Sequence, residues 1–585
     1  MSNRLIKFRL NGSYGLKYLF FSLIIYPTLA FGAARAPVVG EQGMVVAPQR
    51  DASLAGLEVL RAGGNAMDAA ISISLTLSVT DPHHSGIGGG GFILIRLANG
   101  ETFAVDARET APAEARSDMY LLGGVAEDAS KWGGLSVATP GLLAGLELVR
   151  KRWGTKSFSE LVKPAISAAE KGFLLGRSHA RSLAYWENKL AARFPATAAI
   201  QLPLPGRSVD ARIGYRLRQI DKAQTLRLLS RKGVADFYKG SIAKKIVEAT
   251  RQAGGILTLH DLENYEPKVR RPTVGSYRGF EVLSFPPPSS GGIALVQMLQ
   301  ILEGFDLKAM GSGSSASLHI ISEAMKLAFA DRAAHLGDPD FVEIPGWLAT
   351  SSYAERQRSR INPPWTQRSP LTWHKSEVAI NVEGPGEEPK GGGTTHFSVM
   401  DKEGNAVAVT QTINLLFGSG ITVPGTGIIL NNEMDDFAIT TNKPNAFGLI
   451  DTRGSNAVAP RKRPLSSMTP TILTRGGSPY MVIGSPGGPR IITTTLLSII
   501  NVIDYGMDIQ ASVSAPRFHH QWIPNKIRVE PDIPADVLKG LRLRGHKVEA
   551  SSRNWSSAQG IVYQEESGRY FGGTDPRGDG LAVAP

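Results

Sequence analysis

A polar, glycine-rich segment of this chain stops abruptly and gives way to residues that alternate between apolar and polar side chains. Residues 382–393 contain almost no apolar side chains, which is typical of an exposed and easily cut loop. Residues 394–400 and 406–412 then alternate, and the polar residues 401–405 between them favour a turn. The pattern predicts a β-hairpin whose first strand begins at Thr394, directly after the loop.

The length of the turn sets the register of this hairpin. With a five-residue turn Met400 pairs with Ala406, so Thr394 faces Thr412, and Asn414 lies two residues farther on, on the same face. Two hydroxyl groups would then lie side by side at the start of the first strand. Cross-strand pairs of threonines are also common in ordinary sheets, so the pairing alone leaves both interpretations open.

A cut between Gly393 and Thr394 would give Thr394 a free α-amine beside its hydroxyl. Because an α-amine has an ordinary pKa of about 7.7–8.0, it can accept the hydroxyl proton near neutral pH without a histidine. The same hydroxyl could make the cut by attacking the carbonyl carbon of Gly393, which no side chain hinders. Taken alone, however, a threonine after a loop more often just begins a strand.

Composition indicates a large soluble protein and excludes several kinds of chemistry. The 585 residues are too many for one ordinary core, and 42% hydrophobic with 20% charged residues is typical of globular proteins. The chain has no cysteine, which excludes disulfides and thiol chemistry. The net charge of +12 includes no basic run, so we expect no nucleic-acid partner. The pairs His83-His84 and His519-His520 lack helical ligand spacing and supporting carboxylates, so we expect no metal.

The first 36 residues have the order of a secretory signal. A basic stretch from Arg4 to Lys17 precedes an apolar run from Tyr18 to Phe31, and small residues follow. We therefore expect cleavage within residues 32–36 and a periplasmic or secreted protein. An uncleaved anchor helix is the alternative, but the apolar run is short for a membrane span.

Further segments predict the elements around the hairpin. In chain order we expect a helix capped by Asp51 that ends at Ala62, a helix over 66–80, a glycine loop leading into a hairpin over 92–106, mainly helices over 140–270, an amphipathic helix over 315–336, mainly strand patterns up to residue 483, and a helix over 490–503.

Three polar motifs could complete a site around the threonines. Residues 431–436 combine amides with carboxylates and could bind an ammonium group, although alone they are more typical of an acidic turn. Residues 464–470 hold paired hydroxyls between prolines. Residues 484–490 form a glycine loop before a helix, where backbone N–H groups could stabilise an oxyanion. A phosphate loop is the alternative for this last motif, but the Lys-Ser/Thr that such a loop needs is missing.

Together these motifs resemble the gamma-glutamyltransferase (glutathione hydrolase) family. They occur in family order from about residue 40 to the end of the chain: Asp106-Ala-Arg-Glu-Thr-Ala-Pro112, Pro287-Pro-Ser-Ser-Gly-Gly292, Ala330-Asp-Arg332, Gly337-Asp-Pro-Asp-Phe341, Gly392-Gly-Thr-Thr-His396, Asn431-Asn-Glu-Met-Asp-Asp-Phe437, Lys462-Arg-Pro-Leu-Ser-Ser-Met468, Gly484-Ser-Pro-Gly-Gly488 and Ala515-Pro-Arg-Phe-His-His-Gln-Trp522.

The resemblance implies an N-terminal-nucleophile hydrolase fold, an α/β (α+β) four-layer αββα sandwich of two antiparallel sheets flanked by helices. It implies a precursor that, after its signal peptide at residues 1–36, cuts itself into a large subunit, 37–393, and a small subunit, 394–585. Both subunits would build the sandwich jointly as a heterodimer. The implied substrates are glutathione and other gamma-glutamyl compounds, the acceptor is water, an amino acid or a dipeptide, and no cofactor is implied.

The resemblance also implies a role for each site residue. Thr394 is the nucleophile and Thr412 supports it. The substrate groups are assigned as follows: the α-carboxylate to Arg108, Ser466 and Ser467, the α-amine to Asn414, Glu433 and Asp436, and the oxyanion to Gly487 and Gly488. Many bacterial members carry a tyrosine in a lid loop after the acidic cluster, whereas this chain has Phe447 there, so a hydroxyl contact from the lid is lost.

Three other readings remain open. A cephalosporin (glutaryl) acylase of the same fold would need no ammonium site, so the acidic cluster argues against it. A capsule-anchoring transpeptidase acting on poly-gamma-glutamate is the second. An uncleaved binding protein that kept the fold is the third, and the intact Gly393–Thr394 pair and Arg108 argue against it.

Overall fold

Two seven-stranded antiparallel sheets form the centre of the described part of the chain, which covers residues 35–366 and 392–585 of a computed structural model. In spatial order, sheet A consists of β1 (Val38–Gly40), β20 (Arg569–Thr574), β19 (Gln559–Gln564), β15 (Ser478–Gly484), β14 (Thr471–Arg475), β9 (Phe280–Ser284) and β8 (Thr273–Tyr277). Sheet B consists of β21 (Leu581–Val583), β2 (Gly43–Ala47), β10 (Gly392–Asp401), β11 (Ala406–Leu415), β3 (Gly90–Arg96), β4 (Thr102–Ala107) and β7 (Lys268–Arg270).

The two sheets pack face to face, and alternation along each strand divides its side chains between two cores. In β3, Phe92 and Leu94 face sheet A, where Phe92 stacks on Phe285 with ring centroids 4.0 Å apart. Ile93 and Ile95 point the other way, into the core shared with the helices. Because both faces of the strand are buried, its residues from Phe92 to Ile95 are all apolar rather than alternating with polar residues.

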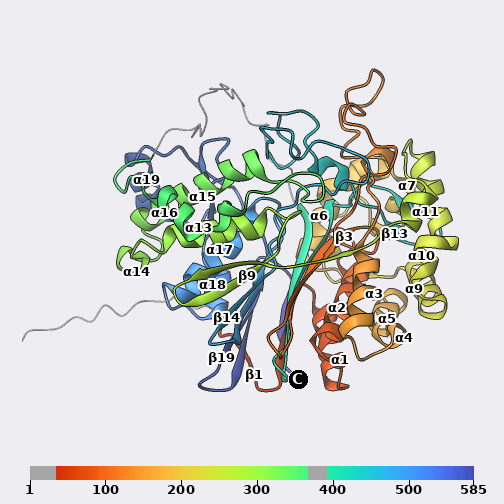
Figure 1. Cartoon of the computed structure of the whole chain (residues 1–585). Helices are drawn as coiled ribbons and strands as arrows, with labels where there is room; N and C mark the ends of the chain where they lie inside the picture. Colours follow the sequence, from red (N-terminus) through yellow and green to blue (C-terminus); the bar gives the residue numbers. More distant parts are fainter. Residues whose placement is uncertain (1–34, 367–391) are drawn as a thin grey trace, which may run out of the picture. The chain divides into compact units, whose positions relative to one another are not determined.

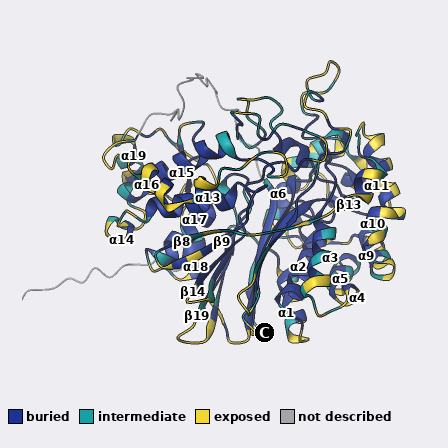
Figure 2. Ribbon diagram, in the orientation of Figure 1, coloured by how far each residue is buried: buried dark blue, intermediate teal, exposed yellow. Residues whose placement is uncertain are grey.

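Helices cover the outer face of each sheet, as Figure 1 shows. Over sheet B lie α1 (Arg50–Arg61), α2 (Ala66–Thr80), α3 (Leu142–Trp153), α5 (Lys163–Lys171) and α9 (Ile220–Lys232). Over sheet A lie α13 (Gly291–Leu302), α15 (Ser315–His335), α16 (Ser351–Arg358), α17 (Arg490–Ile503), α18 (Ile509–Ser514) and α19 (Ala535–Leu543). The central strands are mostly buried, and most exposed residues lie on the outer helices and loops (Figure 2). The predicted αββα sandwich is confirmed.

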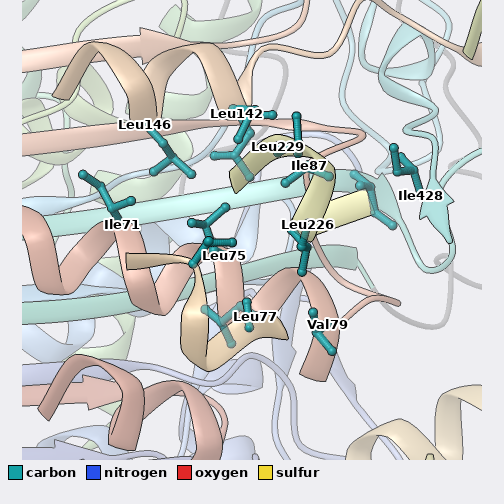
Figure 3. Packing of buried hydrophobic residues seen from close by; sticks show 14 of the residues in the cluster. Ile71, Leu75, Leu77, Val79, Ile87, Leu142, Leu146, Leu226, Leu229 and Ile428 are labelled. Atoms are coloured by element: carbon teal, nitrogen blue, oxygen red, sulfur yellow. The ribbon is translucent and has the colours of Figure 1, made fainter. Parts of the chain in front are cut away.

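Helix α2 is the centre of the core behind sheet B. Its residues Ile71 and Leu75 pack among Leu142 of α3 and Leu226 of α9 (Figure 3). All of its residues are buried, so it lies as an inner helix between the sheet and the outer helices.

The remaining elements complete the fold. They are α4 (Phe158–Leu161), α6 (Arg177–Arg193), α7 (Pro195–Gln201), α8 (Val209–Arg212), α10 (Ala235–Lys239), α11 (Ser241–Gln252), α12 (Leu259–Glu263), α14 (Leu307–Met310), β5 (Phe173–Leu174), β6 (Arg216–Leu217), β12 (Thr422–Val423), β13 (Ile428–Ile429), β16 (Phe518–His519), β17 (Ile527–Val529), β18 (Val548–Ala550) and the 3-10 turns η1 (Gly134–Ser136), η2 (Gly346–Ala349) and η3 (Glu433–Asp436). The predicted predominance of helices over 140–270 is confirmed.

Helix boundaries follow the local signals, with one exception. The helices predicted over 66–80 and 490–503 are confirmed, and α2 begins at a capping box in which Asn65 accepts a hydrogen bond from the N–H of Asp68 at 3.0 Å. The predicted cap at Asp51 is wrong. Gln49 occupies the N-cap position, and Asp51 lies in the first turn, where its negative charge still suits the helix dipole.

The predicted amphipathic helix over 315–336 forms as α15, but it is not amphipathic. Its residues from Ser317 to Ala333 are all buried, polar ones included. The reason is its position, because α13, α14, α16 and α19 all pack around it. Some of its buried polar residues have partners, such as Asp331, which accepts a hydrogen bond from Tyr353 at 2.8 Å.

The predicted predominance of strands up to residue 483 is wrong between 424 and 470. Apart from β13 and η3, this stretch is mainly loop, and side chains replace the ladder hydrogen bonds of a sheet. The carboxylate of Asp451 accepts three backbone N–H groups, at residues 453, 454 and 456. The amide of Asn456 accepts the N–H of Leu465 at 2.9 Å and donates to the carbonyl of Asp436 at 2.7 Å. This loop stretch carries most of the polar motifs singled out above.

Two expectations fall on residues that the structure does not describe: the signal peptide and most of the polar loop before Gly392. Among the described residues, no helix is both long enough and apolar enough to cross a bilayer.

Candidate active site

The hairpin β10–β11 presents Thr394 as the sequence predicts. Met400 pairs with Ala406 and Thr394 with Thr412, which confirms the predicted register. A bulge between Gly393 and Thr394 shifts the ladder, so that Asn414 pairs with Gly393. Both residues hydrogen-bond to the Thr412 hydroxyl, Gly393 through its carbonyl oxygen and Asn414 through its N–H. Asn414 adopts a φ of 74°, a left-handed conformation that asparagine tolerates better than most residues.

The hydroxyl of Thr412 is the hub of the site. It lies 3.0 Å from the hydroxyl of Thr394, accepts the N–H of Asn414 at 2.8 Å and donates to the carbonyl oxygen of Gly393. Because its own proton goes to Gly393, the proton between the two hydroxyls must come from Thr394. The hydrogen bonds thus fix the direction in which the Thr394 hydroxyl points.

These threonines line a cavity of about 20 Å³, which has room for about one water molecule. The cavity brings together nearly all of the predicted site residues: Arg108, Thr394, Thr412, Asn414, Glu433, Asp436, Ser466, Ser467 and Gly488. Its wall also includes Phe447, Leu449, Leu465, Met468 and Ile491. Gly487 precedes Gly488 but does not line the cavity.

Arg108 and the acidic turn η3 form a buried ion cluster in this cavity. One guanidinium nitrogen of Arg108 contacts Glu433 and the other contacts Asp436, and its Nε donates to the carbonyl of Pro464 at 3.1 Å. Burial alone would lower the pKa of Arg108, but these carboxylates hold it above its ordinary value. Burial also raises the pKa of Glu433 well above its ordinary value, against the opposing effect of Arg108.

A further acid, Glu109, belongs to this cluster and was missed in the sequence reasoning. Its side chain is fully buried, 3.8 Å from the guanidinium of Arg108, and burial raises its pKa to about 7. Neither carboxylate oxygen has a hydrogen-bond partner among the described residues. The signal was its position next to Arg108 in the motif of residues 106–112.

Two asparagines hold the acidic turn against the hairpin. Asn431 accepts the N–H of Glu433 at 3.0 Å and donates to the carbonyls of Gly88 and Ala138, both at 2.9 Å. Asn432 accepts the N–H of Leu415 at 3.0 Å, and its carbonyl accepts the side chain of Asn414 at 2.9 Å. These side chains therefore position the turn rather than face the cavity.

The two serines of residues 464–470 differ in their bonding. Ser466 accepts the N–H of Met468 at 3.1 Å, whereas the buried hydroxyl of Ser467 has no partner among the described residues. A buried hydroxyl without a partner at a cavity wall is suited to bind a polar ligand atom.

The glycine loop closes the other end of the cavity. Gly487 and Gly488 have φ angles of 129° and 59°, conformations that favour glycine, and they precede the first turn of α17. A Cβ on Gly488 would lie 2.6 Å from the ring of Phe447. The segment that the resemblance implies as a lid, residues 443–448, is held in place, since Gln521 donates to the carbonyl of Gly448 at 3.0 Å.

The histidine pairs differ in a way that the sequence did not reveal. His519 and His520 have hydrogen-bond partners on both ring nitrogens, including Thr493 and Asn525. The statement that His83 and His84 lack a supporting carboxylate is wrong, because Asp81 lies 2.7 Å from His84 Nδ1. The chain turns after Asp81, and this turn brings the Asp81 carboxylate next to the imidazole of His84.

Comparison with known proteins agrees with this geometry. The model of the gamma-glutamyltranspeptidase family matches residues 52–584. The chain belongs to the gamma-glutamyltranspeptidase family. It is 42% identical over 545 residues to the glutathione hydrolase proenzyme of Escherichia coli (strain K12), covering 92% of this chain and 91% of that relative. It is also 42% identical over 564 residues to the glutathione hydrolase proenzyme of Pseudomonas sp. (strain A14), covering 94% and 96%.

A solved structure of a cephalosporin acylase from Bacillus halodurans has the same fold, with a TM-score of 0.81, 27% identity, and coverage of 97% of this chain and 99% of that chain. The family match and the relatives named glutathione hydrolase proenzyme confirm the prediction of a gamma-glutamyltransferase of the glutathione hydrolase type.

Proposed function

We propose that this gamma-glutamyltranspeptidase cuts its own chain before Thr394 and then uses the freed threonine to break the gamma-glutamyl amide bond of glutathione and related compounds. The observation that carries the proposal is the hydrogen bonding of Thr412, which joins the nucleophile to the carbonyl of Gly393 beside the ion cluster of Arg108.

The first step is an N-to-O shift within the precursor. The Thr394 hydroxyl attacks the carbonyl carbon of Gly393, and the Thr412 hydroxyl stabilises the negative charge that develops on the carbonyl oxygen. The C–N bond breaks as the proton released by the Thr394 hydroxyl passes to the nitrogen of Thr394, which leaves an ester between Gly393 and the Thr394 oxygen. The α-amine of Thr394 is now free, and water then hydrolyses the ester, which releases the carboxylate of Gly393 and restores the hydroxyl of Thr394.

A gel of purified protein tests this step. Wild-type protein should give two bands, the smaller spanning residues 394–585, and its first residue should be Thr394. Thr394→Ala lacks the attacking oxygen and should stay in one piece. A smaller fragment that begins at another residue would reject the mechanism.

Cleavage also opens the site to a substrate. In the uncut chain Gly392 lies next to Gly488, since a Cβ on Gly392 would be 3.3 Å from the backbone nitrogen of Gly488. The cavity of about 20 Å³ is far smaller than the 300 Å³ or more of typical ligand pockets. Withdrawal of the new carboxyl end would expose the glycine loop as the oxyanion hole for Thr394.

The ion cluster suits the zwitterionic end of a gamma-glutamyl group. The α-carboxylate of the substrate would form an ion pair with the guanidinium of Arg108 and accept hydrogen bonds from Ser466 and from the unpaired hydroxyl of Ser467. The α-ammonium group of the substrate would bind to the carboxylates of Glu433 and Asp436 and to the side chain of Asn414. Each ion thus exchanges an internal partner for a substrate partner, so that no buried charge is left uncompensated.

Turnover would proceed through an ester on Thr394. The free α-amine accepts the hydroxyl proton, and the oxygen attacks the gamma carbonyl while Gly487 and Gly488 stabilise the oxyanion. The proton passes to the leaving amine. Water, an amino acid or a dipeptide then takes the gamma-glutamyl group from the ester. None of these steps uses a cofactor.

We also propose that the protein is exported. The proposal rests on the basic and apolar order of residues 1–36. Full-length protein should fractionate with the periplasm or medium and begin within residues 32–37, and deletion of residues 1–36 should keep active protein in the cytoplasm. Cytoplasmic full-length protein with an intact N-terminus would contradict export.

A further inference from the structure

Asp81, His83, His84 and His179 form a cluster outside the catalytic cavity. The three residues of the loop that follows α2 converge, because His84 Nδ1 lies 2.7 Å and His83 Nδ1 3.5 Å from the same oxygen of Asp81. The ligand atoms of these three side chains all lie within 4.8 Å of one another. His179 of α6 stacks on His83 with ring centroids 4.1 Å apart.

Two of these imidazoles are buried without hydrogen bonds. His83 and His179 are 1% and 2% exposed, and none of their ring nitrogens has a hydrogen-bond partner in the described part of the chain. A buried polar group without a partner destabilises the fold, so native proteins rarely keep one without a bound ion, water or function.

We propose that Asp81, His83 and His84 bind a divalent transition-metal ion of the zinc type. One carboxylate oxygen and two imidazole nitrogens are ligands that zinc prefers, and they leave a fourth position for water. The ion would replace the proton that His84 shares with Asp81. It can enter from the side of His84, whose side chain is 20% exposed.

A second cluster in the described residues, His319, Glu323 and His546, fits an ion less well. His319 Nδ1 and His546 Nε2 already hydrogen-bond to each other at 2.8 Å, and the other nitrogen of His319 bonds to the carbonyl of Asn362 at 2.9 Å. An ion there would have to break bonds that satisfy these groups, whereas His83 has none to lose.

The proposed site lies directly behind the nucleophile's partner strand. The carbonyls of His84 and His83 accept the N–H groups of Ile413 and Phe417 at 3.2 and 3.0 Å. Ile413 follows Thr412, so an ion that fixes this loop would also hold the end of β11. Because the ion binds only the folded arrangement of ligands, it should stabilise the folded protein.

Zinc titration of tag-free, chelator-stripped protein tests the proposal, with calorimetry for stoichiometry and thermal unfolding for stability. His84→Gln and Asp81→Asn each remove one ligand, and His84 is partly exposed, so its replacement should fold. His260→Gln is the matched control, since His260 lies on the surface and bonds to Asn264 and Arg461.

Wild type and the control should bind one zinc ion per chain and unfold several degrees higher with zinc. Both ligand variants should bind at least tenfold more weakly and lose most of that shift, while their circular dichroism stays native. Absence of stoichiometric zinc binding in wild type would overturn the proposal. Equal affinity in the ligand variants, or loss of binding in His546→Gln instead, would also overturn it.

Discussion

The hydroxyl of Thr412 fills every role that a hydroxyl offers. It accepts two hydrogen bonds, from Asn414 N–H and the Thr394 hydroxyl, and it donates one, to the carbonyl of Gly393. These three hydrogen bonds fix the orientation of the Thr412 hydroxyl, which joins the Thr394 hydroxyl to the Gly393 carbonyl, the two groups of the proposed cut. The local geometry of the proposed cut therefore depends on this one side chain.

Two substitutions of Thr412 should distinguish the contribution of its hydroxyl group from that of its side-chain shape. Thr412→Val keeps the branched side chain but loses the donor to Gly393, and loss of one oxyanion donor typically slows a reaction about 10²–10³-fold. We therefore expect the rate at which precursor is converted to the two fragments, followed on a gel time course, to fall by about the same factor. Thr412→Ser keeps the hydroxyl and is the control, which should process within a few-fold of wild type. Normal processing of the valine variant would remove Thr412 from the mechanism.

The carboxylate of Asp436 should set the preference for substrates that carry an α-amine. A glutaryl group has the same length and terminal carboxylate as a gamma-glutamyl group but no amine, so it would leave buried carboxylates without a cation. Wild type should therefore prefer gamma-glutamyl anilide to glutaryl anilide by about a hundredfold or more in kcat/KM, since about 1.4 kcal/mol is tenfold.

The variant Asp436→Asn tests this charge directly. It should lower kcat/KM for the gamma-glutamyl anilide sharply and narrow the gap to the glutaryl anilide, while processing continues. Asp435→Asn is a neighbouring control, because Asp435 points away to Ser130 at 2.7 Å. Equal use of the two anilides by wild type would favour the acylase reading instead.

At the scale of elements, the lid segment and the glycine loop that precedes α17 meet at the wall of the cavity. Gly488 has a φ of 59°, and its position leaves no room for a Cβ beside the ring of Phe447. The contact couples the glycine loop, which we assign to the oxyanion, to the segment that covers it.

Substitution of Gly488 should disturb both parts. Gly488→Ala combines a left-handed backbone, which costs an alanine about 1–2 kcal/mol, with a clash against Phe447. We expect kcat/KM to fall at least tenfold. The double variant Phe447→Ala/Gly488→Ala relieves the clash and should recover part of that loss, as measured in a double-mutant cycle. No recovery would mean that backbone strain alone, and not the contact with the lid, causes the defect.

At the scale of the whole molecule, segments from both sides of Gly393 build each sheet. Sheet B pairs β10 and β11 with β2 and β3, and sheet A pairs β14 with β9 (Figure 1). A cut chain would therefore keep its two pieces joined by ladders and by the core between the sheets.

We accordingly expect the processed pieces to behave as one folded unit. Size-exclusion chromatography should give a single peak that contains both bands, and the pieces should separate only in denaturant. The uncut Thr394→Ala protein is the reference for the elution volume. Separate elution of the two pieces without denaturant would contradict the proposed heterodimer.

Acid stability of the fold should depend on its buried neutral histidines. Burial lowers the pKa of His396 from its ordinary 6.5 to about 3, so between these pH values the unfolded chain binds a proton that the folded chain does not. Its contribution to stability is therefore present above pH 6.5 and is lost as the pH falls toward 3. The slope is at most about 1.4 kcal/mol per pH unit for one such group.

His396→Gln isolates this contribution. Glutamine can still bond to Thr410, which lies 2.8 Å from His396 Nδ1, but it does not titrate. Between pH 7 and pH 4 the melting temperature of wild type should fall more steeply than that of the variant. His260→Gln, at an exposed histidine, should keep the wild-type slope, and parallel curves for wild type and His396→Gln would contradict the assignment.

What the sequence by itself determined was local. The five-residue turn fixed the register that sets Thr394 opposite Thr412, and the box of Asn65 and Asp68 fixed the start of α2. These features depend on residues a few positions apart or on one hairpin, where period and turn chemistry suffice. Recognition of the family added the roles expected of the site residues, which periodicity alone does not contain.

Only the tertiary structure decided which distant groups meet. It paired Arg108 with Glu433 and Asp436 across more than three hundred residues, brought Glu109 into the same cluster, and stacked His179 on His83. It also surrounded α15 with helices, so that no exposed face remained. A periodic pattern in the sequence shows which side chains of one helix or strand share a face. Burial on all sides, and the pKa shifts that follow from it, depend on neighbours that the fold brings from elsewhere in the chain.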